Sequence, residues 1–185
     1  MTTLVRGVSR STRISFAAFG IIGFAAALAA ASQVAVPLPW TPVPVTLQPL
    51  LVVLAGMWLG PVAGAASMAL YLAAGAAGVP VFTPLGAPGI ARFFGPTGGY
   101  LLAYPAAAFV AGALAKRAST WLGRWGAATA GVAVILAGGL VQLSLYYGSV
   151  GPALAVGVTP FAALDLVKAW IAAAITNPRV VRRDA

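Results

Sequence analysis

The sequence contains no cysteine and no histidine, and only two of its 185 residues are acidic. Without cysteine there are no disulfides or thiol nucleophiles, and without histidine as well the usual ligands of zinc are missing. Asp165 and Asp184 are the only acids, so catalysis by a pair of carboxylates has almost no basis. No Gly-Lys-Ser/Thr phosphate-binding motif occurs, which argues against ATP hydrolysis by this chain alone. We therefore expect a protein that is not an enzyme and that uses no metal or cofactor.

Charged residues are scarce in general, whereas apolar residues are abundant. Only 7% of the residues are charged, 61% are hydrophobic, and the mean hydropathy is +0.98. An ordinary soluble domain is about 25% charged and about 45–50% apolar. A water-soluble fold of this length could not bury so much apolar surface. The composition predicts an integral membrane protein, and the length suits a single membrane domain over residues 1–185.

The positive charges are grouped along the chain. Nine of the eleven basic residues lie in three clusters, each beside a long apolar run: Arg6, Arg10 and Arg13; Lys116, Arg117 and Arg124; Arg179, Arg182 and Arg183. Cytoplasmic segments of membrane proteins carry such clusters. This placement argues against nucleic-acid binding, which the net charge of +9 would otherwise suggest.

The apolar runs predict six transmembrane helices, at about residues 14–36, 47–59, 61–77, 98–115, 127–147 and 160–176. The run from 47 to 77 is divided at Gly60-Pro61, because one continuous helix would be about 46 Å long against roughly 30 Å of hydrocarbon. Two passes also place all three basic clusters on the cytoplasmic side. We expect an all-α, six-helix membrane bundle with both termini in the cytoplasm. The alternative for the first run is a cleavable signal peptide, although its apolar part exceeds the usual 7–15 residues.

The segments at about 37–46, 78–97 and 148–159 would then lie outside, and their many prolines and glycines predict structured caps. Several aromatic residues fall near this side, either in an interfacial belt or around an apolar pocket: Trp40, Phe82, Tyr100, Tyr104, Tyr146 and Tyr147. Small residues recur at four-residue spacing, which predicts close helix contacts inside the bundle or with a partner subunit: Gly56, Gly60 and Gly64, and Gly23, Ala27 and Ala31.

A few polar residues stand out in this apolar setting. Asp165 and Lys168 lie three residues apart in the last span, on one helix face where they can neutralise each other. Either alone would cost roughly 2.5–3.5 kcal/mol at mid-bilayer, so the pair marks a functional site or a buried ion pair that fixes packing. Arg92 is the only basic residue of the outer segments; it suits bidentate carboxylate binding, or is simply solvated. Gln48 and Tyr100 stand at the mouths of predicted helices.

Four motifs occur in a fixed order: PVPVTLQ at 42–48, GVPVF at 78–82, GPTGGY at 95–100, and Pro160-Phe161 followed by Asp165 and Lys168. The helix that begins within GPTGGY has free N–H groups that favour an anion, although a tight turn also explains the glycines. With these motifs, from about residue 14 to 176, the sequence resembles the BioY family. These are the biotin-specific substrate-binding subunits, or S components, of energy-coupling-factor transporters.

The resemblance implies a multi-pass protein of the cytoplasmic membrane that captures biotin from outside with high affinity. Its partners would be the surrounding lipid, a transmembrane scaffold subunit and ATP-binding subunits. An S component for another vitamin and a stand-alone biotin transporter are the alternatives. By position, Arg92, Asp165 and Lys168 match the family's polar binding residues, and we expect Gln48 and Tyr100 to complete the site. Asp165 would accept from the ureido N–H groups, Lys168 would donate to the ureido carbonyl and Arg92 would hold the carboxylate, unless the two cations exchange roles.

Overall fold

The computed structural model describes the backbone of residues 10–176 and the side chains of residues 17–176. Its helices are α1 (Arg10–Ser32), α2 (Gln48–Leu59), α3 (Pro61–Ala76), the short 3₁₀ helix η1 (Gly89–Phe94), α4 (Gly98–Ala115), α5 (Trp121–Tyr147), α6 (Val150–Gly157) and α7 (Thr159–Ile175). Two strands, β1 (Ala35–Leu38) and β2 (Thr41–Thr46), form the only sheet of the described residues. The first and last basic clusters, at 6–13 and 179–183, fall outside the described side chains.

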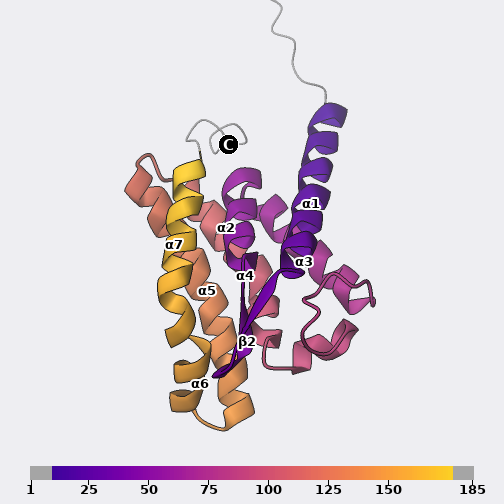
Figure 1. Cartoon of the computed structure of the whole chain (residues 1–185). Coiled ribbons are helices and arrows are strands. Elements are labelled where there is room, and N and C mark those ends of the chain that lie inside the picture. Colours follow the sequence, from indigo (N-terminus) through magenta and orange to yellow (C-terminus); the bar gives the residue numbers. More distant parts are fainter. Residues whose placement is uncertain (1–9, 177–185) are drawn as a thin grey trace, which may run out of the picture.

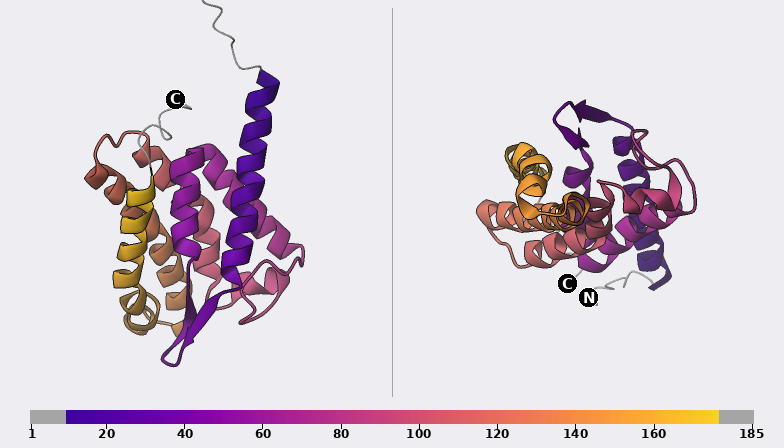
Figure 2. Two further views of the ribbon diagram at one scale, coloured as in Figure 1. Left: turned by 45° about the horizontal axis from the view of Figure 1, so that its top comes forward. Right: turned by 90° about the horizontal axis from the view of Figure 1, so that it is seen from below.

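The long helices run alternately up and down in one bundle (Figure 1). The start of α1, the α2–α3 turn, the α4–α5 turn and the end of α7 lie at one end of the bundle. The β1–β2 hairpin, η1 and α6 lie at the other end (Figures 1 and 2). Lys116 and Arg117 follow α4 directly and are therefore at the same end as both described chain ends. The up-and-down course of the helices therefore agrees with the expectation that the basic clusters lie on one side of the membrane.

The apolar run over 47–77 is broken where the sequence predicts. Gly60 has φ = 84°, a left-handed conformation that glycine adopts readily, and Pro61 is the first residue of α3. Helices α2 and α3 pack closely, since a Cβ on Gly64 would lie only 2.6 Å from the Gly56 Cα. The small residues of this pair thus serve packing inside the bundle. Gly23 of α1, by contrast, has open space where a side chain would be.

Helices α4 and α5 are each long and apolar enough to cross a membrane alone, by length and composition. Helices α6 and α7 pass this test together, as a pair bent by 46°. Helices α2 and α3 are shorter apolar helices of 12 and 16 residues, and α1 contributes the apolar stretch Ala17–Ser32. The protein is a mostly helical multi-pass membrane protein, and the described residues contain two or three spans that are clear from helix length and composition.

The predicted outer segments are ordered, but in ways that hydropathy does not reveal. The first span ends at Ser32, not Val36, because residues from Ala35 turn into the antiparallel hairpin that pairs Val36 with Val45. The prolines of β2 are tolerated because a two-stranded ribbon leaves edges unpaired. The segment predicted as a cap at 148–159 is mostly the short helix α6.

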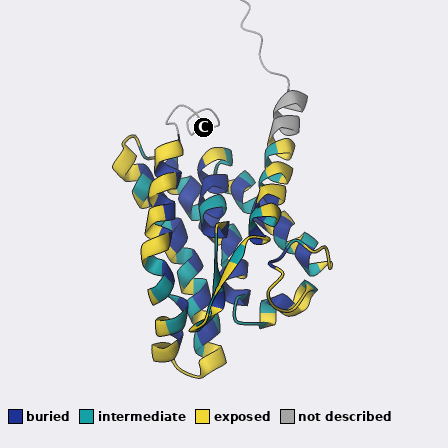
Figure 3. Ribbon diagram, in the orientation of Figure 1, coloured by how far each residue is buried: buried dark blue, intermediate teal, exposed yellow. Residues whose placement is uncertain are grey.

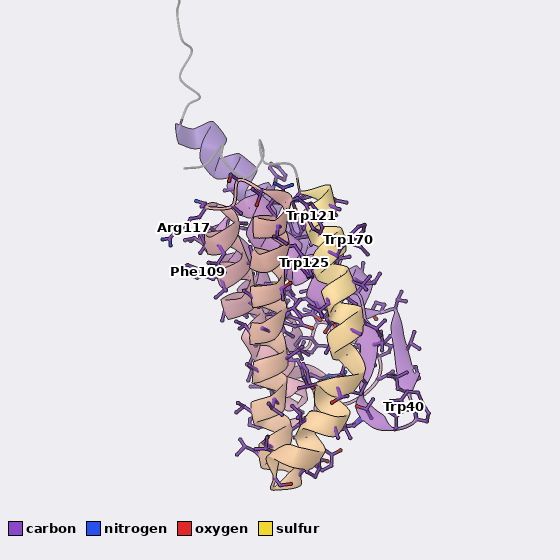
Figure 4. All side chains as sticks on the ribbon, turned by 90° about the vertical axis from the view of Figure 1, so that its left-hand side faces the viewer. Trp40, Phe109, Arg117, Trp121, Trp125 and Trp170 are labelled. Atoms are coloured by element: carbon purple, nitrogen blue, oxygen red, sulfur yellow. The ribbon has the colours of Figure 1, made fainter. Side chains whose placement is uncertain are left out.

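Apolar side chains are exposed around the outside of the bundle, as expected of a lipid-facing surface. The outward faces of α1 and α7 are largely exposed (Figure 3). Trp121, Trp125 and Trp170 gather at the end of the bundle where α5 begins, and Trp40 lies at the opposite end on the hairpin (Figure 4). Trp121 and Trp125 are stacked, with ring centroids 6.1 Å apart. Tryptophan near both ends fits the two interfacial belts of a membrane protein.

Candidate functional site

Two neighbouring cavities lie between the helices and the β2 strand. Cavity A is lined by Pro44, Thr46, Gln48, Phe82, Thr83, Arg92, Thr97, Tyr100, Leu101 and Tyr104. Cavity B is lined by Pro44, Thr46, Pro49, Tyr100, Tyr104, Ile135, Leu136, Phe161, Asp165 and Lys168. The four residues that line both form the wall between them: Pro44, Thr46, Tyr100 and Tyr104. All five residues predicted as substrate-binding therefore border this pair of cavities.

Asp165 and Lys168 supply the charge of cavity B. The Lys168 ammonium donates to Asp165 Oδ1 at 2.6 Å, and both residues are buried, with 8% and 3% of their surfaces exposed for Lys168 and Asp165. Among the described residues this is the only salt bridge, and neither group has another hydrogen bond. The lysine keeps two further N–H donors and the carboxylate keeps acceptor positions. The pair is thus neutralised overall and still able to bind a ligand that carries both donors and an acceptor.

The break before α7 places this pair beside the cavity. Helix α6 ends at Gly157, and Pro160 lies in the first turn of α7, where its missing N–H does no harm. Phe161, Asp165 and Lys168 follow at spacings of four and three residues and are all buried on one helix face. The Pro160-Phe161 motif therefore fixes where α7 begins and which of its faces lines cavity B.

Gln48 lies at the start of α2 with its side chain held on both sides. Its Nε2 donates to the Tyr71 hydroxyl at 2.9 Å, and its Oε1 accepts from the Thr46 hydroxyl at 3.2 Å. Gln48 is only 3% exposed. Its amide therefore links β2 to α3, and the side chain lines cavity A.

Tyr100 separates the two cavities and is held tightly. Its hydroxyl donates to the Gly157 carbonyl at 2.6 Å, which is free because α6 ends there. Its ring lies against Gly139 of α5, where a Cβ would collide with the ring atoms. The tyrosine hydroxyl is occupied by the protein, so the ring is the part of Tyr100 that a ligand would contact.

Arg92 belongs to η1 and enters cavity A from the outer loop. It is 4% exposed, and its Nη2 donates to the Thr83 carbonyl at 2.5 Å while Nη1 donates to the Leu85 carbonyl. Its Nε is buried and has no hydrogen-bond partner among the described residues. Burial lowers the pKa of the guanidinium, but arginine is not deprotonated in proteins, so the group remains a cation. A buried cation with a free donor at a cavity wall is suited to binding an anion.

The first turn of α4 lies beside Arg92. Thr97 precedes this 18-residue helix without a side-chain capping bond, and Thr97, Tyr100 and Leu101 line cavity A together with the arginine. The N-terminal end of a helix carries unsatisfied N–H groups and a partial positive charge. Cavity A is therefore electropositive at two points and contains no acidic residue, whereas cavity B contains the balanced ion pair.

The sequence missed several lining residues. Thr46 and Thr97 lie within predicted motifs but give no separate signal, because a threonine in a turn is usually local structure. Of the aromatic residues assigned to a belt or a pocket, Phe82, Tyr100 and Tyr104 are buried and line the cavities, while Trp40, Tyr146 and Tyr147 are exposed. Only tertiary packing separates these two groups.

Comparison with known proteins identifies the class of this fold and site. The chain matches the BioY family over residues 8–183, nearly its whole length, and it belongs to that family. It is 36% identical over 138 residues to the "Biotin transporter BioY" of Thermotoga maritima, covering 75% of this chain and 81% of that protein. It is 39% identical over 136 residues to the "Probable biotin transporter BioY" of Pyrococcus horikoshii, covering 74% and 80%.

A solved structure shares the fold. The crystal structure of the S-component for biotin from an ECF-type ABC transporter superposes with a TM-score of 0.84, covering 97% of each chain at 24% sequence identity. At that identity the likeness shows the fold of an S component. The family is one of transporters, since both relatives are named as biotin transporters, confirmed or probable.

Proposed function

We propose that this protein takes up biotin, as the high-affinity S component of an energy-coupling-factor transporter in the cytoplasmic membrane. The family membership and the two relatives named as biotin transporters support this function. The observation that carries it is the pair of adjacent cavities, one with a balanced ion pair and the other with a buried, partly unpartnered arginine. The two ends of biotin match these two cavities: its neutral ureido ring suits the ion pair of cavity B, and its carboxylate suits the arginine of cavity A.

The proposed binding mode follows from matching the two ends. In cavity B, the Asp165 carboxylate accepts from the ureido N–H groups and the Lys168 ammonium donates to the ureido carbonyl. In cavity A, the free Nε–H of Arg92 and the start of α4 bind the carboxylate. The rings of Tyr100 and Tyr104 pack against the apolar middle of the ligand. The reversed orientation, with Lys168 on the carboxylate, is the competing arrangement.

The size of the cavities adds a requirement. Each has a volume of about 40 Å³, room for about three water molecules at roughly 10–15 Å³ each. Biotin is much larger, so it can bind only if the two cavities join. Joining them requires the hairpin part of the shared wall, Pro44 and Thr46, to move away from Tyr100, which stays bonded to Gly157. The threonine and proline belong to the hairpin, which is tied to α6 by the Thr41 hydroxyl donating to the Val156 carbonyl at 2.7 Å.

The membrane arrangement is part of the proposal. Six spans, α1 to α5 and the bent α6–α7 pair, form a single domain over residues 1–185 with both termini in the cytoplasm. The hairpin, η1 and α6 then face outward, where biotin arrives. The alternating course of the helices supports this arrangement, as does the position of Lys116 and Arg117 at the end opposite the cavity-forming caps.

The proposed partners are a transmembrane scaffold subunit and ATP-binding subunits, because this chain has no nucleotide-binding motif of its own. Biotin uptake by cells that express the chain with and without such a module distinguishes an S component from a stand-alone transporter. Equilibrium binding of labelled biotin to the purified protein tests the function itself. Competition by other unlabelled vitamins at equal concentration distinguishes biotin from a different vitamin substrate. Failure of biotin to bind while another vitamin binds would reject the assignment.

A further inference from the structure

A third cavity lies outside cavity A, in the loop between α3 and α4. It has a volume of about 200 Å³, larger than either inner cavity. Its lining comes from the residue directly after α1 and from the loop: Gln33, Gly78, Val79, Pro80, Phe82, Thr83, Pro84, Gly86, Pro88, Gly89 and Arg92. We refer to it as the outer cavity.

The outer cavity and cavity A share one wall. Phe82, Thr83 and Arg92 line both cavities. The Phe82 ring lies against Gly75, and makes edge contacts with Tyr71 and Phe93 at centroid distances of 5.4 and 5.7 Å. The wall is thus one aromatic ring, one buried threonine and the arginine, with the loop exposed on the far side.

The loop is folded around the guanidinium. Gly86 has φ = 110°, a conformation that residues with a side chain rarely adopt, and a Cβ there would lie 2.5 Å from Arg92 Nη1. The two Nη atoms donate to loop carbonyls. The Nε–H lies in the shared wall and has no hydrogen-bond partner among the described residues. Asp165 and Asp184 are the only acids of the sequence, and Asp165 is paired with Lys168 in cavity B. Within residues 17–176, therefore, no acidic side chain neutralises the cationic wall of the outer cavity.

We propose that the outer cavity is a first binding site for the ligand's carboxylate and the entrance to the inner cavities, with Arg92 common to both sites. The ligand class is a monocarboxylate with an apolar body, and the inference rests on the proposed function. A carboxylate that reaches the outer cavity meets the cation that also lines cavity A. Displacement of the Phe82 ring then opens the shared wall, and the arginine keeps contact with the anion as it moves inward.

The test obstructs the outer cavity without altering the inner site. Val79 lines only the outer cavity and is 49% exposed. Because the chain has no cysteine, Val79→Cys gives a single reactive thiol that can be modified after purification of the folded protein. Val36→Cys on β1 is the matched control, since Val36 is 55% exposed and lines none of the three cavities. Each variant is modified with a methyl or a benzyl methanethiosulfonate, and complete labelling is verified by mass spectrometry.

Association and dissociation of labelled biotin are then measured for each form. A group that only narrows a route raises the barrier in both directions, so both rate constants fall by the same factor and their ratio, Kd, is unchanged. We expect the benzyl label at Val79→Cys to slow both rates at least tenfold at constant Kd, and the methyl label to change little. Both labels at Val36→Cys should leave the rates unchanged. An anionic sulfonatoethyl label at Val79→Cys should slow association more than a cationic trimethylammonium-ethyl label.

Unchanged rates with the benzyl label in place would overturn the proposal, because the ligand would then reach the inner site by another route, such as beneath the hairpin. A weaker Kd with an unchanged association rate would overturn it as well, since the loop would then support only the bound state. Both results leave the proposed function intact, because each requires that the labelled protein still binds biotin. Failure of the unlabelled parent protein to bind biotin would instead reject the proposed function and this inference with it.

Discussion

Replacement of Arg92 by alanine tests whether this residue binds the carboxylate end of biotin. The guanidinium makes two hydrogen bonds to loop carbonyls and has one free donor, so Arg92→Ala removes a loop support and a ligand contact together. A charge-assisted hydrogen bond contributes about 1.5–3 kcal/mol. Loss of the carboxylate contact alone should therefore weaken biotin binding roughly tenfold to a hundredfold, at about 1.4 kcal/mol per factor of ten.

Biotin amide separates the ligand contact from the loop support. The amide has no charge for Arg92 to bind, so it should bind the parent protein weakly and lose little more in Arg92→Ala. The resulting coupling energy between residue and ligand group should be about 1–3 kcal/mol by titration calorimetry of all four combinations. Arg117→Ala is the matched control for loss of one positive charge, because Arg117 is exposed at the other end of the bundle. Equal weakening of both ligands would refute the carboxylate role and would favour Lys168 as its partner.

Three further predictions concern the rest of the site and the membrane arrangement. Asp165→Asn should weaken biotin binding at least tenfold and lower the thermal stability, because it leaves the Lys168 charge unpaired, while the protein still inserts. Adding Lys168→Met should restore the thermal stability but not the binding. Unchanged affinity in Asp165→Asn would show that the pair is purely structural. Tyr100→Phe should lower the stability by about 0.5–1.5 kcal/mol through loss of the bond to Gly157, with less than a threefold change in Kd, since the hydroxyl is already occupied; a large loss of affinity would show that the hydroxyl contacts the ligand. Reporter fusions at Arg6, Gly123 and Arg182 should be cytoplasmic and those at Pro88 and Gly151 external, and an external reading at Gly123 would contradict the six-span arrangement.

The helices were largely predictable because a membrane imposes simple rules. Residues 98–115 were predicted as a span and form α4 with the same bounds, and the division at Gly60-Pro61 separates α2 from α3. Uncharged runs and a Gly-Pro break are strong local signals. The β1–β2 hairpin and α6 were predicted only as structured caps, because their form depends on contacts with the bundle and not on hydropathy.

The candidate site was predictable at its charged residues, because a charge in an apolar membrane segment costs free energy. Asp165, Lys168 and Arg92 stood out because charge is rare in this chain, and the structure places all three at adjacent cavities. Their partners were not predictable. The occupation of both Nη atoms of Arg92 by loop carbonyls, and of the Tyr100 hydroxyl by Gly157, depends on residues brought together by the fold. These contacts decide which atoms remain free for a ligand.

Binding of biotin by the isolated chain is the measurement that tests the central claim most directly. The chain, purified in detergent, should bind labelled biotin with one site per molecule, and excess unlabelled biotin should displace it while other vitamins do not. The Asp165→Asn and Arg92→Ala variants, measured in parallel, should each lose at least tenfold in affinity. Absence of saturable biotin binding by the folded parent protein, or equal displacement by an unrelated vitamin, would contradict the account.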